Sequence, residues 1–204
     1  MPDLYPNFAA LSAKEKQGIA YEISVADRGT HILVLAPHGG NIEPGTSEIA
    51  KAVARNDLSM YVFEGLRARS GELHITSHRF DDPQCLKLVS GVHTAVAIHG
   101  RKDGDDPETV SVGGLDVGLG KAIASSLREA GFVVAPAVAG LAATDQNNIC
   151  NRGKSGLGVQ LELPRSLRDQ LVHDEAKLES FADAIRAAIK HQSLPHPPLT
   201  PGSG

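Results

Sequence analysis

The sequence contains no tryptophan, three tyrosines and five phenylalanines. Aromatic side chains are the platforms on which proteins stack single-stranded nucleic acid, so this class of binding protein is poorly supported. Basic charge is not in surplus either, because 20 Lys and Arg stand against 24 Asp and Glu and give a formal net charge of −4. A nucleic-acid binder normally carries a basic surplus. We therefore expect no nucleic-acid partner.

Cysteine is also scarce, since the chain holds only Cys85 and Cys150. The two could form at most one bridge, and neither lies in a C-x-x-C motif. A disulfide scaffold and a cysteine-rich structural zinc site are therefore both excluded. We expect reduced thiols, as in a cytosolic protein. If this protein carries metal chemistry, histidines, aspartates and glutamates must supply the ligands, and nine histidines are available.

Long apolar runs are missing as well. Residues 1–6 lack the basic start and the apolar stretch of a signal peptide. The longest weakly polar stretch, 132–143, has about half the length that spans a bilayer, and it contains Pro136 and Gly140. The sequence thus predicts a protein without a membrane partner, in the cytoplasm or released by cell lysis, with a monomer as the default assembly.

The chain has enough apolar residues, 41% of 204, to bury the core of one domain. Segments with the periodicity of strands alternate with segments typical of helices. The predicted strands cover 21–26, 32–36, 58–63, 73–76, 92–98, 132–137 and 159–163. The predicted helices cover 46–55, 115–130 and 167–190. Several strands are almost entirely apolar, so we expect an α/β fold in which helices cover both faces of the sheet.

The clearest change in composition lies at the end of the chain. Residues 194–204 contain four prolines and finish with Gly-Ser-Gly, which is typical of an unstructured terminus. We therefore predict one domain over 1–193 and a flexible Pro/Gly-rich tail over 194–204. In an α/β domain the functional groups gather at the carboxyl ends of the strands, so chemistry is to be sought there.

Two predicted strands end in a histidine followed by glycine. The strand over 32–36 runs into a glycine-rich loop that holds His38 and, five residues later, Glu43. The glycines after His38 allow the loop to fold back, so that both side chains converge. The strand over 92–98 runs into His99. Each residue alone also fits a plain structural role, but together they supply three ligands and leave one position for water, as in a catalytic zinc site.

A further strand carries a glutamate. Alternation over 159–163 places Gln160 and Glu162 on the face opposite the apolar side chains. An unpaired buried carboxylate is costly, so Glu162 needs a partner or a function. It is either one half of a structural ion pair or a general base that takes a proton from water beside a metal ion.

A polar loop precedes this strand and contains Asn148, Asn151 and Arg152. Amide and guanidinium groups suit the binding of a carboxylate or an oxyanion. The same residues also fit an asparagine-rich turn held by hydrogen bonds.

Other histidines are predicted to have no part in this site. His74 and His78 lie in a segment that resembles a strand, where they would share a face about 13 Å apart. A second metal site is therefore not expected there. His93, which precedes His99 on the same predicted strand, is predicted to be structural.

Four stretches of the sequence together resemble the zinc-dependent poly-γ-glutamate hydrolases of bacteriophages and their bacterial relatives. They are 36–48 (APHGGNIEPGTSE), 96–100 (VAIHG), 147–153 (NNICNRG) and 158–163 (GVQLEL). The resemblance extends from residue 3 to near residue 190. It implies a compact, zinc-carboxypeptidase-like fold, with a mixed central sheet flanked by helices on both faces.

The resemblance also implies roles for single residues. His38, Glu43 and His99 would hold one zinc ion per chain, and Glu162 would be the general base. Arg152 would face the substrate and help to stabilise the oxyanion. Members of the family cleave the γ-amide that links glutamates within a polymer, so the implied partner is an anionic γ-glutamyl chain.

The free α-carboxylates of such a chain would need cations and polar groups. Asn148, Asn151 and Arg165, together with Arg152, are the predicted substrate-binding residues. Asn41 stands where the family usually has glycine, which alters the packing of the loop but removes no ligand. Because the net charge of −4 opposes an anionic substrate, cations must gather locally at the cleft. The candidates near strand ends are Arg101, Lys102, Arg152, Arg165 and Arg168.

Two other functions stay open on the sequence alone. The same site fits a zinc amidohydrolase that acts on another small anionic N-acyl compound. The chain could also be a catalytically silent protein that binds an anionic polymer, although the presence of all the proposed ligands and the base counts against this.

Overall fold

The computed structural model describes residues 3–192, and their side chains through residue 190. The predicted tail over 194–204 lies outside the described residues. Strands of the described part are β1 (Tyr21–Ala26), β2 (Ile32–Gly40), β3 (Ser59–Gly65), β4 (Thr94–Arg101), β5 (Val110–Gly113), β6 (Val134–Pro136) and β7 (Val159–Pro164). Its α-helices are α1 (Phe8–Ser12), α2 (Thr46–Ala54), α3 (Pro83–Gly91), α4 (Val117–Glu129), α5 (Arg165–His173) and α6 (Glu175–Gln192). Two 3₁₀ turns, η1 (Ser70–Leu73) and η2 (Ile149–Arg152), complete the described elements.

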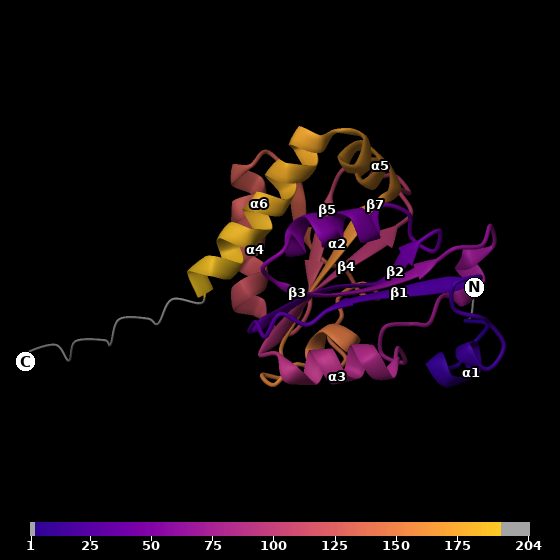
Figure 1. Ribbon diagram of the computed structural model, residues 1–204. Helices are drawn as coiled ribbons and strands as arrows, with labels where there is room; N and C mark the ends of the chain where they lie inside the picture. The colour runs from indigo at the N-terminus through magenta and orange to yellow at the C-terminus, as the bar shows by residue number, and fades with distance from the viewer. Residues whose placement is uncertain (1–2, 193–204) are drawn as a thin grey trace, which may run out of the picture.

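The strands form one mixed sheet in the order β1-β3-β2-β4-β7-β5-β6 (Figure 1). The four central strands β3, β2, β4 and β7 are parallel to one another. β1 pairs antiparallel with β3, and β5 pairs antiparallel with β7. The parallel centre brings the carboxyl ends of β2, β4 and β7 to the same edge of the sheet, which is where His38, His99 and Glu162 lie.

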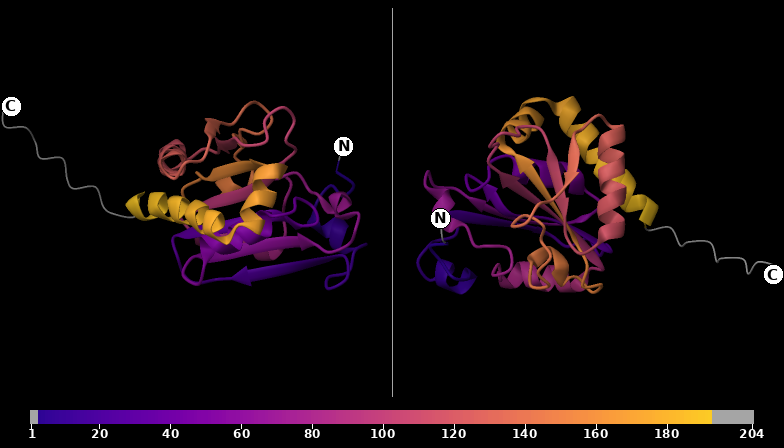
Figure 2. Two further views of the ribbon diagram at one scale, coloured as in Figure 1. Left: turned by 90° about the horizontal axis from the view of Figure 1, so that it is seen from above. Right: turned by 180° about the vertical axis from the view of Figure 1, so that it is seen from behind.

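Helices cover both faces of the sheet, and each face has its own buried core. Helices α2, α4, α5 and α6 lie on one side, and α1 and α3 lie on the other (Figures 1 and 2). Alternate side chains of each central strand enter the two cores. In β4, for example, Val96 and Ile98 pack toward α2 and α6, whereas Ala95 and Ala97 pack toward α3. The mixed sheet flanked by helices is therefore confirmed.

Aspartate caps decide where three of the helices begin. The carboxylates of Asp82, Asp116 and Asp174 each accept a backbone N–H from the first turn of α3, α4 and α6. The cap at Asp174 corrects one prediction, because the expected single helix over 167–190 is two helices. Asp174 has an extended backbone (φ −124°, ψ 96°) and ends α5 before it caps α6.

The expected strand over 73–76 is also wrong. Residues 70–73 form the turn η1, and residues 74–76 follow it without joining the sheet. Helices α1 and α3 and the strand β5 were not predicted from the sequence. Within residues 3–192, no helix has the length and apolar character needed to cross a membrane.

Candidate active site

A β-bulge at the end of β2 aims His38 at the site. β2 pairs with β3 in regular register as far as Ala36, and the register then shifts by one residue before Gly39. Such a bulge inserts one extra residue and changes the face to which the following side chains point. By simple alternation from Leu35, which packs on the α3 face, His38 would point to the opposite face. With the bulge, His38 lies on the α3 face and is buried beside Ile75.

The loop after β2 folds back and brings Glu43 to His38. The Glu43 N–H donates to the carbonyl of His38 at 2.9 Å, and Gly40 and Gly45 have positive φ angles of 59° and 95° that glycine adopts without strain. Glu43 Oε1 lies 3.2 Å from His38 Nδ1. Its Oε2 accepts the backbone N–H of Gly100 at 2.7 Å, so the carboxylate is held from both sides.

His99 completes the cluster from β4. Its Nδ1 lies 3.1 Å from His38 Nδ1 and 3.7 Å from Glu43 Oε2. His38 Nε2 donates to the carbonyl of Ile75 at 2.8 Å, so Nε2 carries a proton and Nδ1 faces the cluster. His99 Nε2 lies 3.3 Å from the hydroxyl of Ser77. Imidazole nitrogens that converge on a carboxylate, with outer nitrogens held by neighbours, are a donor set that fits zinc.

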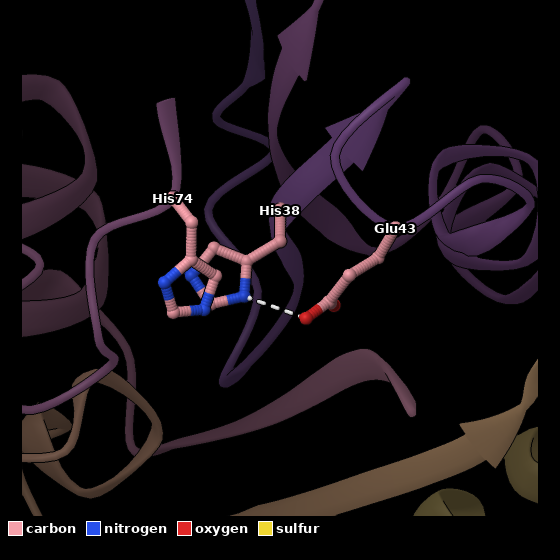
Figure 3. A group of neighbouring side chains, drawn as sticks. All are labelled: His38, Glu43 and His74. Atoms are coloured by element: carbon pink, nitrogen blue, oxygen red, sulfur yellow. Dashed lines mark ion pairs between the residues drawn. The ribbon is translucent and has the colours of Figure 1, made fainter. Parts of the chain in front are cut away.

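His74 lies against this cluster, which the sequence did not predict. Its ring centroid is 4.1 Å from that of His38 (Figure 3). Ligand atoms of His38, Glu43 and His74 all lie within 4.8 Å of one another, so these three residues also form a possible metal-binding group. His74 was assigned to a strand and to no site, and the absence of a strand at 74–76 is the reason for the error. His93 is exposed and lies outside this site.

Glu162 stands beside the cluster on the neighbouring strand. It is the register partner of His99 across β4 and β7, and its side chain is buried on the same face. Gln160 Nε2 donates to Glu162 Oε1 at 2.8 Å, and Asn148 Nδ2 donates to Gln160 Oε1 at 3.1 Å. This chain of amides orients the carboxylate. Within the described part of the chain, Glu162 is therefore held by a neutral donor and forms no close ion pair.

The two buried carboxylates have opposite pKa shifts. Burial raises the pKa of Glu162 to about 7, and the nearby Glu43 adds to that effect. Burial alone would also raise the pKa of Glu43, but His38 and His99 outweigh it and hold that pKa well below its ordinary value. Glu43, which stays ionised, suits a charged metal ligand. Glu162, which can exchange a proton near neutral pH, suits a general base beside it.

A cavity of about 450 Å³ opens over the cluster. His38, Glu43, His74, His99, Asn148 and Glu162 are among the residues that line it. His78, which is exposed, and Arg101 also line it. The Arg101 guanidinium bonds to other parts of the protein. It donates to carbonyls of the loop between β4 and β5 and pairs with Asp106 at 2.9 Å.

The structure does not bring the other predicted substrate residues into this cavity. Arg152 donates to the carbonyls of Asn147, Phe80 and His78, so its guanidinium joins these loops. Arg165 is exposed and pairs with Asp169. Asn151 is buried and donates to the carbonyls of 143 and 145, which lie in the wall of the cavity. The expected cluster of arginines is absent, since Arg101 is the one arginine among the described residues that line the cavity.

Arg168, one of the cations considered for substrate, instead holds the site together. Its buried guanidinium donates to the carbonyls of Leu163 at 3.1 Å and Arg101 at 3.1 Å, and also to that of Pro44. These carbonyls belong to the end of β7, the end of β4 and the loop that carries Glu43. The guanidinium also packs on Gly100, where an added Cβ would lie 2.4 Å from Arg168 Cζ.

Replacing Arg168 by methionine is expected to destabilise the protein by about 2–4 kcal/mol. The change leaves three inward-facing carbonyls without their donor, and each buried unsatisfied group costs about 1–3 kcal/mol. Urea unfolding followed by circular dichroism measures the effect. Arg165→Met on the same helix is the matched control, and we expect it to cost less than about 1 kcal/mol because Arg165 makes an exposed ion pair. Equal, small losses in both variants would contradict the bracing role of Arg168.

The fold and the cluster together define a class of enzyme. A histidine–histidine–carboxylate cluster beside a buried glutamate, at the carboxyl ends of parallel strands, is typical of metal-dependent hydrolases. A model of the poly-gamma-glutamate hydrolase family matches residues 5–185. The chain therefore belongs to the poly-γ-glutamate hydrolase family, whose members are hydrolases of amide bonds.

Individual relatives agree with this assignment. The chain is 39% identical to UPF0714 protein YmaC of Bacillus subtilis (strain 168) over 177 residues, which cover 85% of this chain and 74% of YmaC. The structure of a bacteriophage poly-gamma-glutamate hydrolase is 35% identical, with a TM-score of 0.88 over 94% of this chain and 98% of that one. The zinc-free apo structure of YndL, a B. subtilis protein, is 32% identical, with a TM-score of 0.87 over 95% and 100%. The zinc-carboxypeptidase-like fold implied by the sequence resemblance is thus confirmed.

Proposed function

We propose that this chain is a zinc-dependent hydrolase that cleaves the γ-glutamyl amide bonds of poly-γ-glutamate. The observation that carries the proposal is the convergence of His38 Nδ1, His99 Nδ1 and the Glu43 carboxylate within 3.1–3.7 Å, with Glu162 on the adjacent strand. Membership of the family supports the choice of substrate.

His38, Glu43 and His99 would hold one zinc ion in this proposal. The carbonyl of Ile75 and the hydroxyl of Ser77 fix the two imidazole rings from behind, as outer-sphere groups do at zinc sites. A zinc ion bound there would polarise the scissile carbonyl and lower the pKa of a nearby water. Glu43 would remain ionised and oppose the charge of the metal, in keeping with its lowered pKa.

Glu162 would act as the general base. Its raised pKa of about 7 allows it to take a proton from the attacking water and to return that proton to the departing α-nitrogen. Gln160 would orient the carboxylate through Oε1 and leave the second oxygen for the proton transfer. In this way one residue serves the attack and the departure of the leaving group.

Substrate contacts would come from the wall of the cavity. Of the predicted substrate-binding residues, Asn148 is the one that we retain as a direct contact, because it lines the cavity. Arg152 and Asn151 would act indirectly, by holding loops at the rim. The α-carboxylates of a γ-linked chain would meet His78 at the opening of the cavity.

Incubation of the zinc-loaded protein with poly-γ-glutamate tests the proposal. We expect the mean chain length to fall early in the reaction, which size-exclusion chromatography measures. Hydrolysis of small N-acyl glutamates with the polymer left intact would favour the alternative amidohydrolase. A polymer that is bound but left uncut by fully zinc-loaded protein would instead identify a silent binding protein.

A further inference from the structure

Asp3, near the beginning of the chain, contacts the segment that carries His74. Its carboxylate is 3% exposed and accepts four hydrogen bonds. The donors are His74 Nδ1 at 2.7 Å, the N–H and the hydroxyl of Thr76 at 2.8 Å each, and Arg79 Nη2 at 2.7 Å. These bonds tie the first described residue to the non-sheet segment that forms one wall of the cavity.

The contact fixes the orientation of the His74 ring. An ionised carboxylate only accepts hydrogen bonds, so Nδ1 of His74 carries the ring proton and Nε2 keeps its lone pair. Figure 3 shows the His74 ring lying against that of His38 at a tilt of 36°, with its second nitrogen turned to the side on which His38 Nδ1 meets Glu43. Ligand atoms of these three residues lie within 4.8 Å of one another.

We propose that Asp3 is a positioning residue of the active site, which holds His74 so that Nε2 joins His38 and Glu43 as a metal-binding group. The inference rests on the proposed function, since it takes the cluster to be a metal centre. A carboxylate behind a histidine is a common outer-sphere partner at metal sites, where it selects the tautomer and strengthens the donor. His74 would then be a fourth protein group at the centre, compatible with the five-coordinate states that catalytic zinc adopts.

The chain offers a control that separates this role from simple anchoring. The N-terminal segment has a second attachment, in which the Phe8 N–H donates to Asp81 Oδ1 at 2.6 Å. Asp81 makes no hydrogen bond to His74 among those of the described residues. Asp81→Ala therefore loosens the segment and leaves the Asp3–His74 contact in place, whereas Asp3→Ala removes that contact.

Tautomers of the histidine rings in the metal-free protein give the first test. Long-range ¹H–¹⁵N NMR is expected to show His74 protonated at Nδ1 in the wild type and in Asp81→Ala. Asp3→Ala should shift the ring toward the Nε2–H form, and Asp3→Asn, which keeps an acceptor oxygen, should retain most of the Nδ1–H form. An unchanged His74 tautomer in folded Asp3→Ala would overturn the inference.

Zinc affinity, measured by competition with a chromophoric chelator, gives the second test. We expect Asp3→Ala to weaken binding by about 10- to 100-fold, as the loss of outer-sphere partners does. His74→Ala should weaken it at least as much, and the double variant no more than His74→Ala, because Asp3 acts through His74. Asp81→Ala should bind like the wild type.

The outcomes separate the two proposals. A wild type that binds no zinc refutes the proposed function, and with it the metal-binding role of His74. A wild type that binds zinc, with unchanged affinity in Asp3→Ala and His74→Ala and lost affinity in His38→Ala, preserves the centre and refutes the role of Asp3. If Asp3→Ala does not fold, Asp3→Ser, whose side chain is shorter and lacks the carboxylate, replaces it in the comparison with His74→Ala.

Discussion

Replacing Glu162 by glutamine is expected to lower the rate of polymer hydrolysis by about 10²- to 10⁴-fold, the usual contribution of a general base. The amide keeps the shape of the side chain and removes the ability to accept a proton. Because Glu162 is not one of the converging metal-binding groups, zinc affinity should change little. Initial rates from the fall in chain length, together with zinc titration, measure both effects.

Glu179→Gln, an exposed change on α6, is the matched control and should retain wild-type rates. Hydrolysis by Glu162→Gln at more than about a tenth of the wild-type rate would show that another group takes the proton. Loss of zinc binding in the same variant would instead place Glu162 among the metal ligands.

In the metal-free protein, the effect of Glu162→Gln on the free energy of unfolding should depend on pH. The pKa of Glu162 is about 7 in the folded protein against an ordinary 4.5, because burial disfavours the charged form. The folded wild type therefore holds a proton that the unfolded chain has released between these values, and its stability falls as pH rises through this window. Relative to the wild type, Glu162→Gln should gain up to about 3 kcal/mol at pH 8 and nothing from this source at pH 4. Urea unfolding at the two pH values checks the sign, and a gain that is larger at pH 4 would contradict the assignment.

Replacing His38 by alanine is expected to abolish activity and to weaken zinc binding by more than about 100-fold, beyond the loss caused by an outer-sphere change. His38 belongs to both possible metal-binding groups, with His99 on one side and His74 on the other. Its removal therefore leaves a carboxylate with histidines that no longer converge. Chelator competition measures the affinity, and chain-length analysis measures the activity.

Removal of zinc from the wild type by a chelator should give the same loss, and added zinc should restore activity. His93→Ala is the matched control, since His93 is exposed and lies outside the cavity. Full activity of His38→Ala after exhaustive chelation would refute a metal mechanism.

The convergence of the main site residues could be predicted because it follows from sheet geometry. His38 and His99 end neighbouring parallel strands, and Glu162 alternates with apolar residues that fix its face. Parallel strands present their carboxyl ends at one edge, so the sequence predicts that these residues lie at the same edge of the sheet. That His38 also lies on the same face as His99 and Glu162 depends on the bulge in β2, which the sequence did not predict. The family resemblance then supplied the chemistry.

Other parts depend on packing that the sequence does not encode locally. Arg165 and Arg168 follow the end of β7 and Arg152 precedes the strand, but whether a guanidinium is free depends on which groups surround it. The link between Asp3 and His74 joins residues 71 positions apart. No periodicity could reveal it, because the segment over 74–76 is held by side-chain bonds and does not belong to a strand.

The extra residue of the bulge in β2 determines the face of the sheet on which His38 lies. In a strand without the bulge, a side chain three residues after Leu35 would follow simple alternation and point toward the opposite core, so the placement is all or none. Grafting this site onto another parallel sheet would therefore require transfer of the extra residue together with the histidines and the glutamates. A design that copied the side chains alone would reproduce the composition of the site on the wrong side of the sheet.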